Sequence, residues 1–229
     1  MRLRDAMLLA EDLLLLLTDD RTGRLLASST EVDVALGGAL LVELALGDRV
    51  DLAGASEARG RLFVRDTSPT GDELLDDALA KIAAKESKRP EDVVRRLGKG
   101  LRDRLYARLA DRGVLREESG RILRVLPVHH WPATDAGHED EVRGRLAEAL
   151  RTGVVDDPRI AALISLLHAL KAVGTVIDPA SAGVSKHELN ANAKRIAEGD
   201  WGAEAVRQAI EALLAAVVAS SSVAVSGGT

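Results

Sequence analysis

The chain contains no cysteine and very few aromatic residues, and both absences narrow the possible functions. Without thiols it forms no disulfides and offers no thiolate ligands to a metal. The absence of cysteine does not indicate whether the protein works in a reducing or an oxidising compartment. Aromatic residues make up only 2% of the sequence, so a base-stacking platform for single-stranded nucleic acid is not available.

Long hydrophobic runs are lacking as well. Residues 13–17 are all leucine, which is far short of the roughly 20 apolar residues that span a bilayer. Arg2 and Arg4 precede this run, as in a secretion signal, but Glu11 and Asp12 interrupt the apolar segment and no small-residue cleavage site follows. We therefore expect a cytoplasmic protein whose contact with membranes is peripheral and reversible.

Motifs of catalysis are also missing. The chain has no glycine-rich phosphate loop, no Gly-x-Ser-x-Gly elbow and no His-Glu-x-x-His sequence. Adjacent acid pairs such as Asp76-Asp77 would diverge by about 100° on a helix, which is typical of turns and caps. His129, His130 and His138 lack the spacing of a metal site. We expect a protein that is not an enzyme and that holds no metal or cofactor.

What the sequence does contain is helical periodicity. A chain of 229 residues buries a substantial core, as one large domain or two closely packed ones. The pattern predicts helices at residues 3–17, 29–46, 70–85, 90–112, 158–173, 186–198 and 201–219. Alternation predicts short strands at 49–53 and 61–65, and a second hairpin, GVLREE with RILRVL, that turns at Ser119-Gly120.

The predicted fold class is therefore mainly α, with a central helical bundle, surrounding amphipathic helices and one or two small β-hairpins. We expect residues 1–219 to form a single helical domain. Residues 220–229 are small and polar, and we expect a flexible tail there.

Charge is distributed unevenly along the chain. Residues 81–124 hold 14 basic and 7 acidic residues, a local balance of +7, whereas the whole chain carries −5. Arg95, Lys99 and Arg102 recur at helical spacing in the segment 90–112, so the pattern predicts three cations on one helix face. Overall acidity argues against a protein that coats nucleic acid, but the local cluster favours one anionic partner.

Two other functions remain open on the pattern alone. A helix followed by a charged turn and a hairpin occurs twice, which is the order of winged-helix nucleic-acid-binding modules. We regard nucleic acid as the less favoured partner. The second is a scaffold that binds only other proteins and has no anionic ligand.

Several motifs, read in order, resemble the Golgi phosphoprotein 3 family. They are LLLLLTDDRTGRL, ALGGALLVELALGDRVDL, SPTGDELLDDALAKI, LRDRLYARLADRGVL and LISLLHAL, and the likeness covers roughly residues 3 to 219. The Ala-, Leu-, Arg-, Gly- and Asp-rich composition is typical of a bacterial relative. The resemblance implies a mostly helical fold with a protruding hairpin. It also implies a peripheral membrane protein that binds phosphatidylinositol 4-phosphate and acts as an adaptor for membrane-protein tails, the client here being unknown.

The same resemblance implies a headgroup site. The family's two basic residues that grip the phosphate fall on Lys99 and Arg102, and Arg95 lies close enough in sequence to add charge. The chain departs from the family at two pocket positions. The position of the family's arginine is Gly37 here, and the position of the family's tryptophan falls near Ser28. With these two residues replaced, the resemblance implies a site for anionic lipid headgroups in general more than one specific for a phosphoinositide.

The resemblance also assigns the second hairpin to self-association and to contact with the membrane. Ile122, Leu123 and Val125 are its apolar residues, and Arg121 and Arg124 alternate with them. The alternative is a hairpin that packs one face against its own domain.

Overall fold

The computed structural model describes residues 7–20, 22–52, 61–84, 89–116, 118–122, 126–130, 137–199 and 217. Within them the helices are α1 (Leu9–Leu16), α2 (Ser29–Leu46), α3 (Glu73–Ala83), α4 (Pro90–Gly98), α5 (Leu101–Asp111), α6 (Gly137–Thr152), α7 (Pro158–Ala169), α8 (Val173–Val176) and α9 (Lys186–Ala197). The strands are β1 (Val50–Leu52) paired with β2 (Leu62–Val64), and β3 (Glu118–Ile122) paired with β4 (Leu126–His130), both antiparallel.

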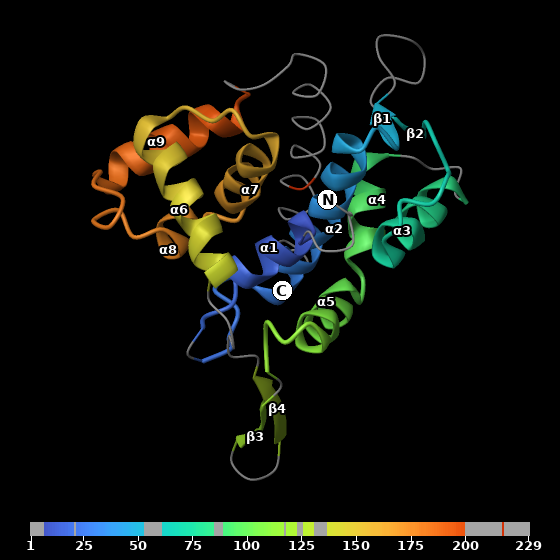
Figure 1. Ribbon diagram of the computed structural model, residues 1–229, viewed down its shortest axis with the longest axis horizontal. Coiled ribbons are helices and arrows are strands. Elements are labelled where there is room, and N and C mark those ends of the chain that lie inside the picture. The colour runs from blue at the N-terminus through green and yellow to red at the C-terminus, as the bar shows by residue number, and fades with distance from the viewer. Residues whose placement is uncertain are drawn as a thin grey trace, which may run out of the picture.

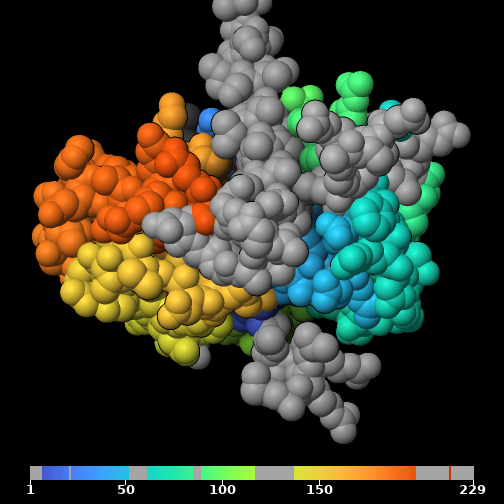
Figure 2. Space-filling view, turned by 90° about the horizontal axis from the view of Figure 1, so that it is seen from above, coloured from blue at the N-terminus to red at the C-terminus, as the bar shows by residue number. Residues whose placement is uncertain are grey.

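The prediction of a mainly α fold with two small hairpins is confirmed. Helices α1 and α2 lie at the centre, with α6 to α9 on one side and α3 and α4 on the other (Figure 1). Seen from above, α9 and the β2–α3 region again lie on opposite sides (Figure 2). Every residue of α1 is buried, including the charged Glu11 and Asp12, and α2 is buried on nearly all faces because its middle turns are almost wholly apolar. The β3–β4 pair projects from the end of the molecule near α5 (Figure 1).

Helix starts follow the capping residues in the sequence. Ser28 caps α2 by accepting from the Glu31 N–H, and the helix begins at Ser29 as expected. Asp72 accepts from two N–H groups of α3, and Ser185 forms a capping box with Glu188 at α9. These caps fix where α2, α3 and α9 begin.

The basic segment 90–112 is not one helix, as its periodicity predicted, but two. Helix α4 ends at Gly98, Lys99 is extended, and Gly100 adopts a left-handed φ of 71° before α5 begins. A left-handed residue cannot continue a right-handed helix, so the two segments change direction there. The prediction of three cations on one helix face is therefore wrong.

The second hairpin has a different register from the expected one. Ser119 pairs with His129 and Gly120 with Val128, so neither residue lies in the turn, and His129 and His130 belong to β4. The N–H groups of Val114 and Leu115 bond to the Leu109 carbonyl at the end of α5. Because residues 113–115 close the helix in this way, they do not enter the strand.

The sequence pattern missed α6 and placed some helix ends wrongly. His138 and Glu139 lie in the first turn of α6, a helix that the pattern did not predict. The helix expected at 158–173 ends at Ala169, and α8 follows as a separate turn. Apart from Val217, the expected helix 201–219 and the tail 220–229 lie outside the described residues, as do residues 1–6.

Candidate anion-binding site

The break between α4 and α5 lies directly against α2, and two glycines bring the helices together. A Cβ built on Gly37 would lie 2.2 Å from the Val94 carbonyl oxygen and 2.7 Å from the Gly98 nitrogen. A Cβ on Gly98 would lie 2.0 Å from the Asp33 carbonyl oxygen. The backbones approach so closely that neither position accepts a side chain, and this crossing places Lys99 beside the first turns of α2.

Arg102 reaches across the break to the N-terminal end of α2. Its Nη1 lies 3.4 Å from Asp33 Oδ1 and donates to the Ser29 carbonyl oxygen at 3.4 Å. The guanidinium is partly buried, with a side-chain exposure of 24%. Arg102 is thus held in one place by an acid and a carbonyl on the same helix end.

Lys99 and Ser28 complete this neighbourhood. The Lys99 side chain is exposed, and within the described residues no carboxylate lies within 4.0 Å of its ammonium. Ser28 Oγ donates to Glu31 Oε2 at 2.5 Å and accepts from the Glu31 N–H at 3.4 Å, so it serves the helix cap. The N-terminal ends of α2 and α5 both carry partial positive charge, which favours an anion beside them.

The other predicted site residues are placed differently. Arg95 is exposed in the last turn of α4, before the break, so it does not share a helix with Arg102. Gly37 lies buried in the helix crossing rather than at the surface. Ile122 is the last residue of β3, whereas Leu123 and Val125 lie outside the described residues, so the hairpin hypothesis remains a prediction.

Asp33 is the functional candidate that the sequence pattern missed, because it looked like a residue of the helix start. Burial raises the pKa of its carboxyl above the ordinary 3.8, although the nearby Arg102 acts in the opposite direction. Its Oδ1 is buried and makes no hydrogen bond. The Asp33 carboxylate therefore already pairs with the guanidinium that a phosphate would contact. Burial makes the charged form of this carboxylate less favourable than it is in water.

Helix α5 is fixed to the rest of the molecule by polar contacts. Tyr106 Oη and Thr18 Oγ1 share a buried hydrogen bond of 3.0 Å. Arg108 Nε lies 3.0 Å from the fully buried Glu11, and Arg112 Nη1 lies 3.3 Å from the same carboxylate. Burial raises the pKa of Glu11 and its basic partners oppose that shift. The cations of α5 are thus carried on a rigid element.

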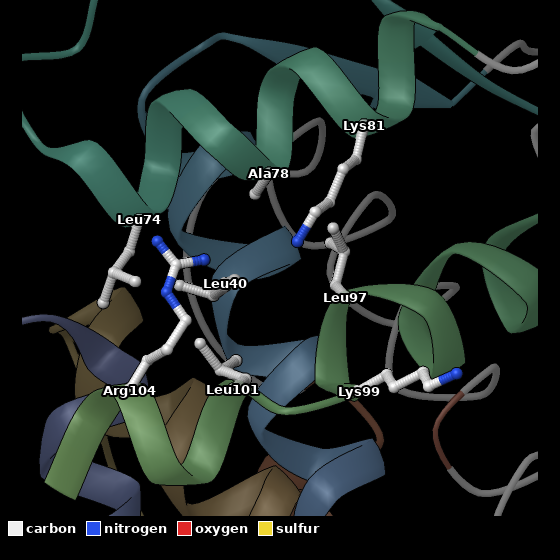
Figure 3. Close-up of a pocket in the computed structure, with 8 residues that line it drawn as sticks. All are labelled: Leu40, Leu74, Ala78, Lys81, Leu97, Lys99, Leu101 and Arg104. Carbon is white, nitrogen blue, oxygen red and sulfur yellow. The ribbon is translucent and has the colours of Figure 1, made fainter. Parts of the chain in front are cut away.

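A small hollow lies on the α3 side of the same break. Lys81 from α3 and Arg104 from α5 extend toward it, while the Lys99 side chain points away from it (Figure 3). The sequence pattern singled out neither Arg104 nor Lys81 as a site residue. The signal that could have found Lys81 is its place in the last turn of an otherwise acidic helix.

Two negative observations apply to the part of the chain that the structure describes. None of its helices is long and apolar enough to cross a membrane. In the same residues no group of three or more His, Cys, Asp or Glu side chains could hold a metal ion.

A bundle around two buried helices, with a projecting hairpin and a break between two helices before it, defines a class of mainly helical protein. The chain belongs to the Golgi phosphoprotein 3 (GPP34) family, whose model matches residues 9–213. The expected resemblance is confirmed.

A curated relative carries the name vacuolar protein sorting-associated protein 74 and comes from Eremothecium gossypii. The two sequences are 29% identical over 167 residues, which covers 62% of this chain and 48% of the relative. This chain therefore aligns with about half the length of that protein, and the activity of the whole relative does not transfer by itself.

Proposed function

We propose that this protein is a non-catalytic peripheral membrane protein that binds the phosphate of an anionic phospholipid headgroup through Lys99 and Arg102. The observation that carries the proposal is the α4–α5 break, which leaves Lys99 exposed and holds Arg102 against the N-terminal end of α2. Ammonium and guanidinium donors make charge-assisted bonds to phosphate oxygens, and arginine does so with two donors.

Phosphatidylinositol 4-phosphate is the headgroup that family membership favours. The family's tryptophan and arginine are replaced by Ser28 and Gly37, which serve a helix cap and a helix crossing here. With fewer donors around the headgroup, we expect less discrimination among anionic lipids than a complete pocket provides. A role as adaptor for the tails of membrane proteins belongs to the same proposal, and the relative's name in protein sorting supports it.

Vesicle co-sedimentation tests the proposal. Wild type is expected to pellet with vesicles that contain phosphatidylinositol 4-phosphate, less with phosphatidylserine vesicles and not with phosphatidylcholine alone. Lys99→Glu/Arg102→Glu should lose this binding, because two attractive charges become repulsive. Wild-type binding should also weaken as salt is raised, since exposed charges are screened.

The matched control is Lys186→Glu/Lys194→Glu on α9, which changes the net charge equally at exposed residues on the opposite side of the molecule (Figure 1). It should bind like wild type. Equal binding by the Lys99→Glu/Arg102→Glu variant, or no binding by wild type, would contradict the proposal. A salt-titrated shift assay with duplex DNA tests the nucleic-acid alternative, because phosphate contacts weaken steeply with salt.

A further inference from the structure

The hollow between α3, α4 and α5 has the dimensions and charge of a small anion site. Its volume is about 50 Å³, several times the ~10–15 Å³ that one water molecule requires. Its lining consists of Leu40, Leu74, Ala78, Lys81, Leu97, Lys99, Leu101 and Arg104. The hollow thus has an apolar floor and cationic walls, and it is large enough for one tetrahedral oxyanion.

The two cations that enter the hollow come from different helices. Lys81 extends from the last turn of α3 and Arg104 from α5, and their charged ends approach the same space (Figure 3). Arg104 Nη2 lies 2.7 Å from Asp77 Oδ2 and 3.7 Å from Glu73 Oε1. Among the residues described, none accepts from its Nε or Nη1, and no carboxylate lies within 4.0 Å of the Lys81 ammonium.

The start of α5 adds to this charge. Gly100 is its N-cap, in the left-handed conformation, and no side chain caps the helix. Leu101, in the first turn, lines the hollow. The first N–H groups of a helix lack partners within it, so the positive end of α5 lies at the rim of the hollow.

We propose that this hollow is an oxyanion subsite that takes one phosphate group between Lys81 and Arg104. Asp77 holds the guanidinium in position, the ammonium approaches from the other wall, and the leucine floor accommodates the carbon chain of a phosphate ester. Lys99 borders the hollow, but its side chain points away from it (Figure 3). The Arg102 guanidinium faces Ser29 and Asp33 on α2, so the phosphate contacts here are made by different cations. The shared chemistry of its ligand is phosphate, supplied by a lipid headgroup or by a soluble phosphate.

Amide-detected NMR on the full chain, titrated with inorganic phosphate at low salt, tests the subsite. Wild type should show saturable shifts at Ala78 and Leu101. Lys81→Gln should weaken phosphate binding about 10-fold, since a charge-assisted contact is lost. Lys81→Arg, which keeps the cation, should restore most of it. Lys186→Gln is the matched control and should bind phosphate like wild type, because Lys186 is exposed on α9.

Separate arms identify the source of the phosphate. If Lys81→Gln also loses binding to vesicles with phosphatidic acid, the source is a lipid. If it loses only inorganic phosphate, the source is soluble. Absence of saturable shifts in wild type, or equal phosphate binding by a folded Lys81→Gln, overturns the subsite. Arg102→Gln should keep the phosphate shifts at Ala78, so this result is independent of the outcome for the Lys99–Arg102 site.

Discussion

Asp33 determines how readily Arg102 is available to an anion. Its carboxylate lies 3.4 Å from the guanidinium, and its Oδ1 is buried without a hydrogen bond. An incoming phosphate must displace this contact or share the cation with it. Asp33→Asn removes the competing charge and should raise affinity for anionic vesicles about 2- to 5-fold, the equivalent of about 0.4–1 kcal/mol for a partly exposed ion pair.

The same competition predicts a pH dependence. Burial raises the pKa of Asp33 above the ordinary 3.8, so the carboxylate takes up a proton at a higher pH than a free aspartate does. The neutral carboxyl no longer pairs with Arg102, which becomes available to an anion. Co-sedimentation with phosphatidylglycerol vesicles, whose phosphodiester keeps its charge, should therefore strengthen as pH falls toward 4. Asp33→Asn should lose this dependence, whereas Asp111→Asn, the same substitution at the C-terminal end of α5, should keep it. A pH profile shared by wild type and Asp33→Asn would refute the competition.

At the scale of the helices, the crossing of α2 and α4 at Gly37 sets the shape of the site. A Cβ at Gly37 would meet the Val94 carbonyl oxygen at 2.2 Å, and backbone cannot yield as a side chain does. Gly37→Ala should therefore destabilise the protein by about 1–3 kcal/mol in urea unfolding. Gly37→Arg, which restores the family's arginine, should destabilise it more and should not improve lipid binding.

Gly144→Ala supplies the control for this prediction. A Cβ at Gly144 in α6 would meet nothing within 4 Å, so alanine should stabilise that helix by about 0.5–1 kcal/mol. If Gly37→Ala were as stable as Gly144→Ala, the close approach of α2 and α4 would not hold in solution.

The sequence pattern predicted some of the helices but not the break between α4 and α5. Periodicity and caps predicted α2, α3 and α9 because their apolar stripes and capping residues are local. The break at Lys99 follows from tertiary contact: Gly98 packs on the Asp33 backbone, which no local pattern contains. The role of Gly37 was hidden for the same reason. Family resemblance singled out Lys99 and Arg102, but the contacts of Arg102 with Ser29 and Asp33 required the fold.

At the scale of the whole molecule, buried carboxyl groups link α6 to the central helices. Glu139, in the first turn of α6, accepts from Arg143 Nε at 2.9 Å and lies against Asp20 in the connection after α1. Nearby, His138 Nε2 and Asp12 Oδ1 of α1 are 2.7 Å apart. These contacts join the first turn of α6 to α1 and to the connection that follows α1.

The titration of Glu139 predicts how stability depends on pH. Burial raises the pKa of Glu139 and the adjacent Asp20 raises it further; Arg143 acts in the opposite direction, and the pKa stays above the ordinary 4.5. An acid whose pKa is raised by folding binds protons more tightly in the folded state, so its contribution to stability falls as pH rises through the interval above 4.5. Glu139→Gln keeps an oxygen for Arg143 and removes the titrating charge. The free energy of urea unfolding, measured from pH 4.5 to 8, should therefore decline less steeply in Glu139→Gln than in wild type. Glu141→Gln, an exposed change on the same helix, should keep the wild-type slope, and an unchanged slope in Glu139→Gln would rule out this acid as its source.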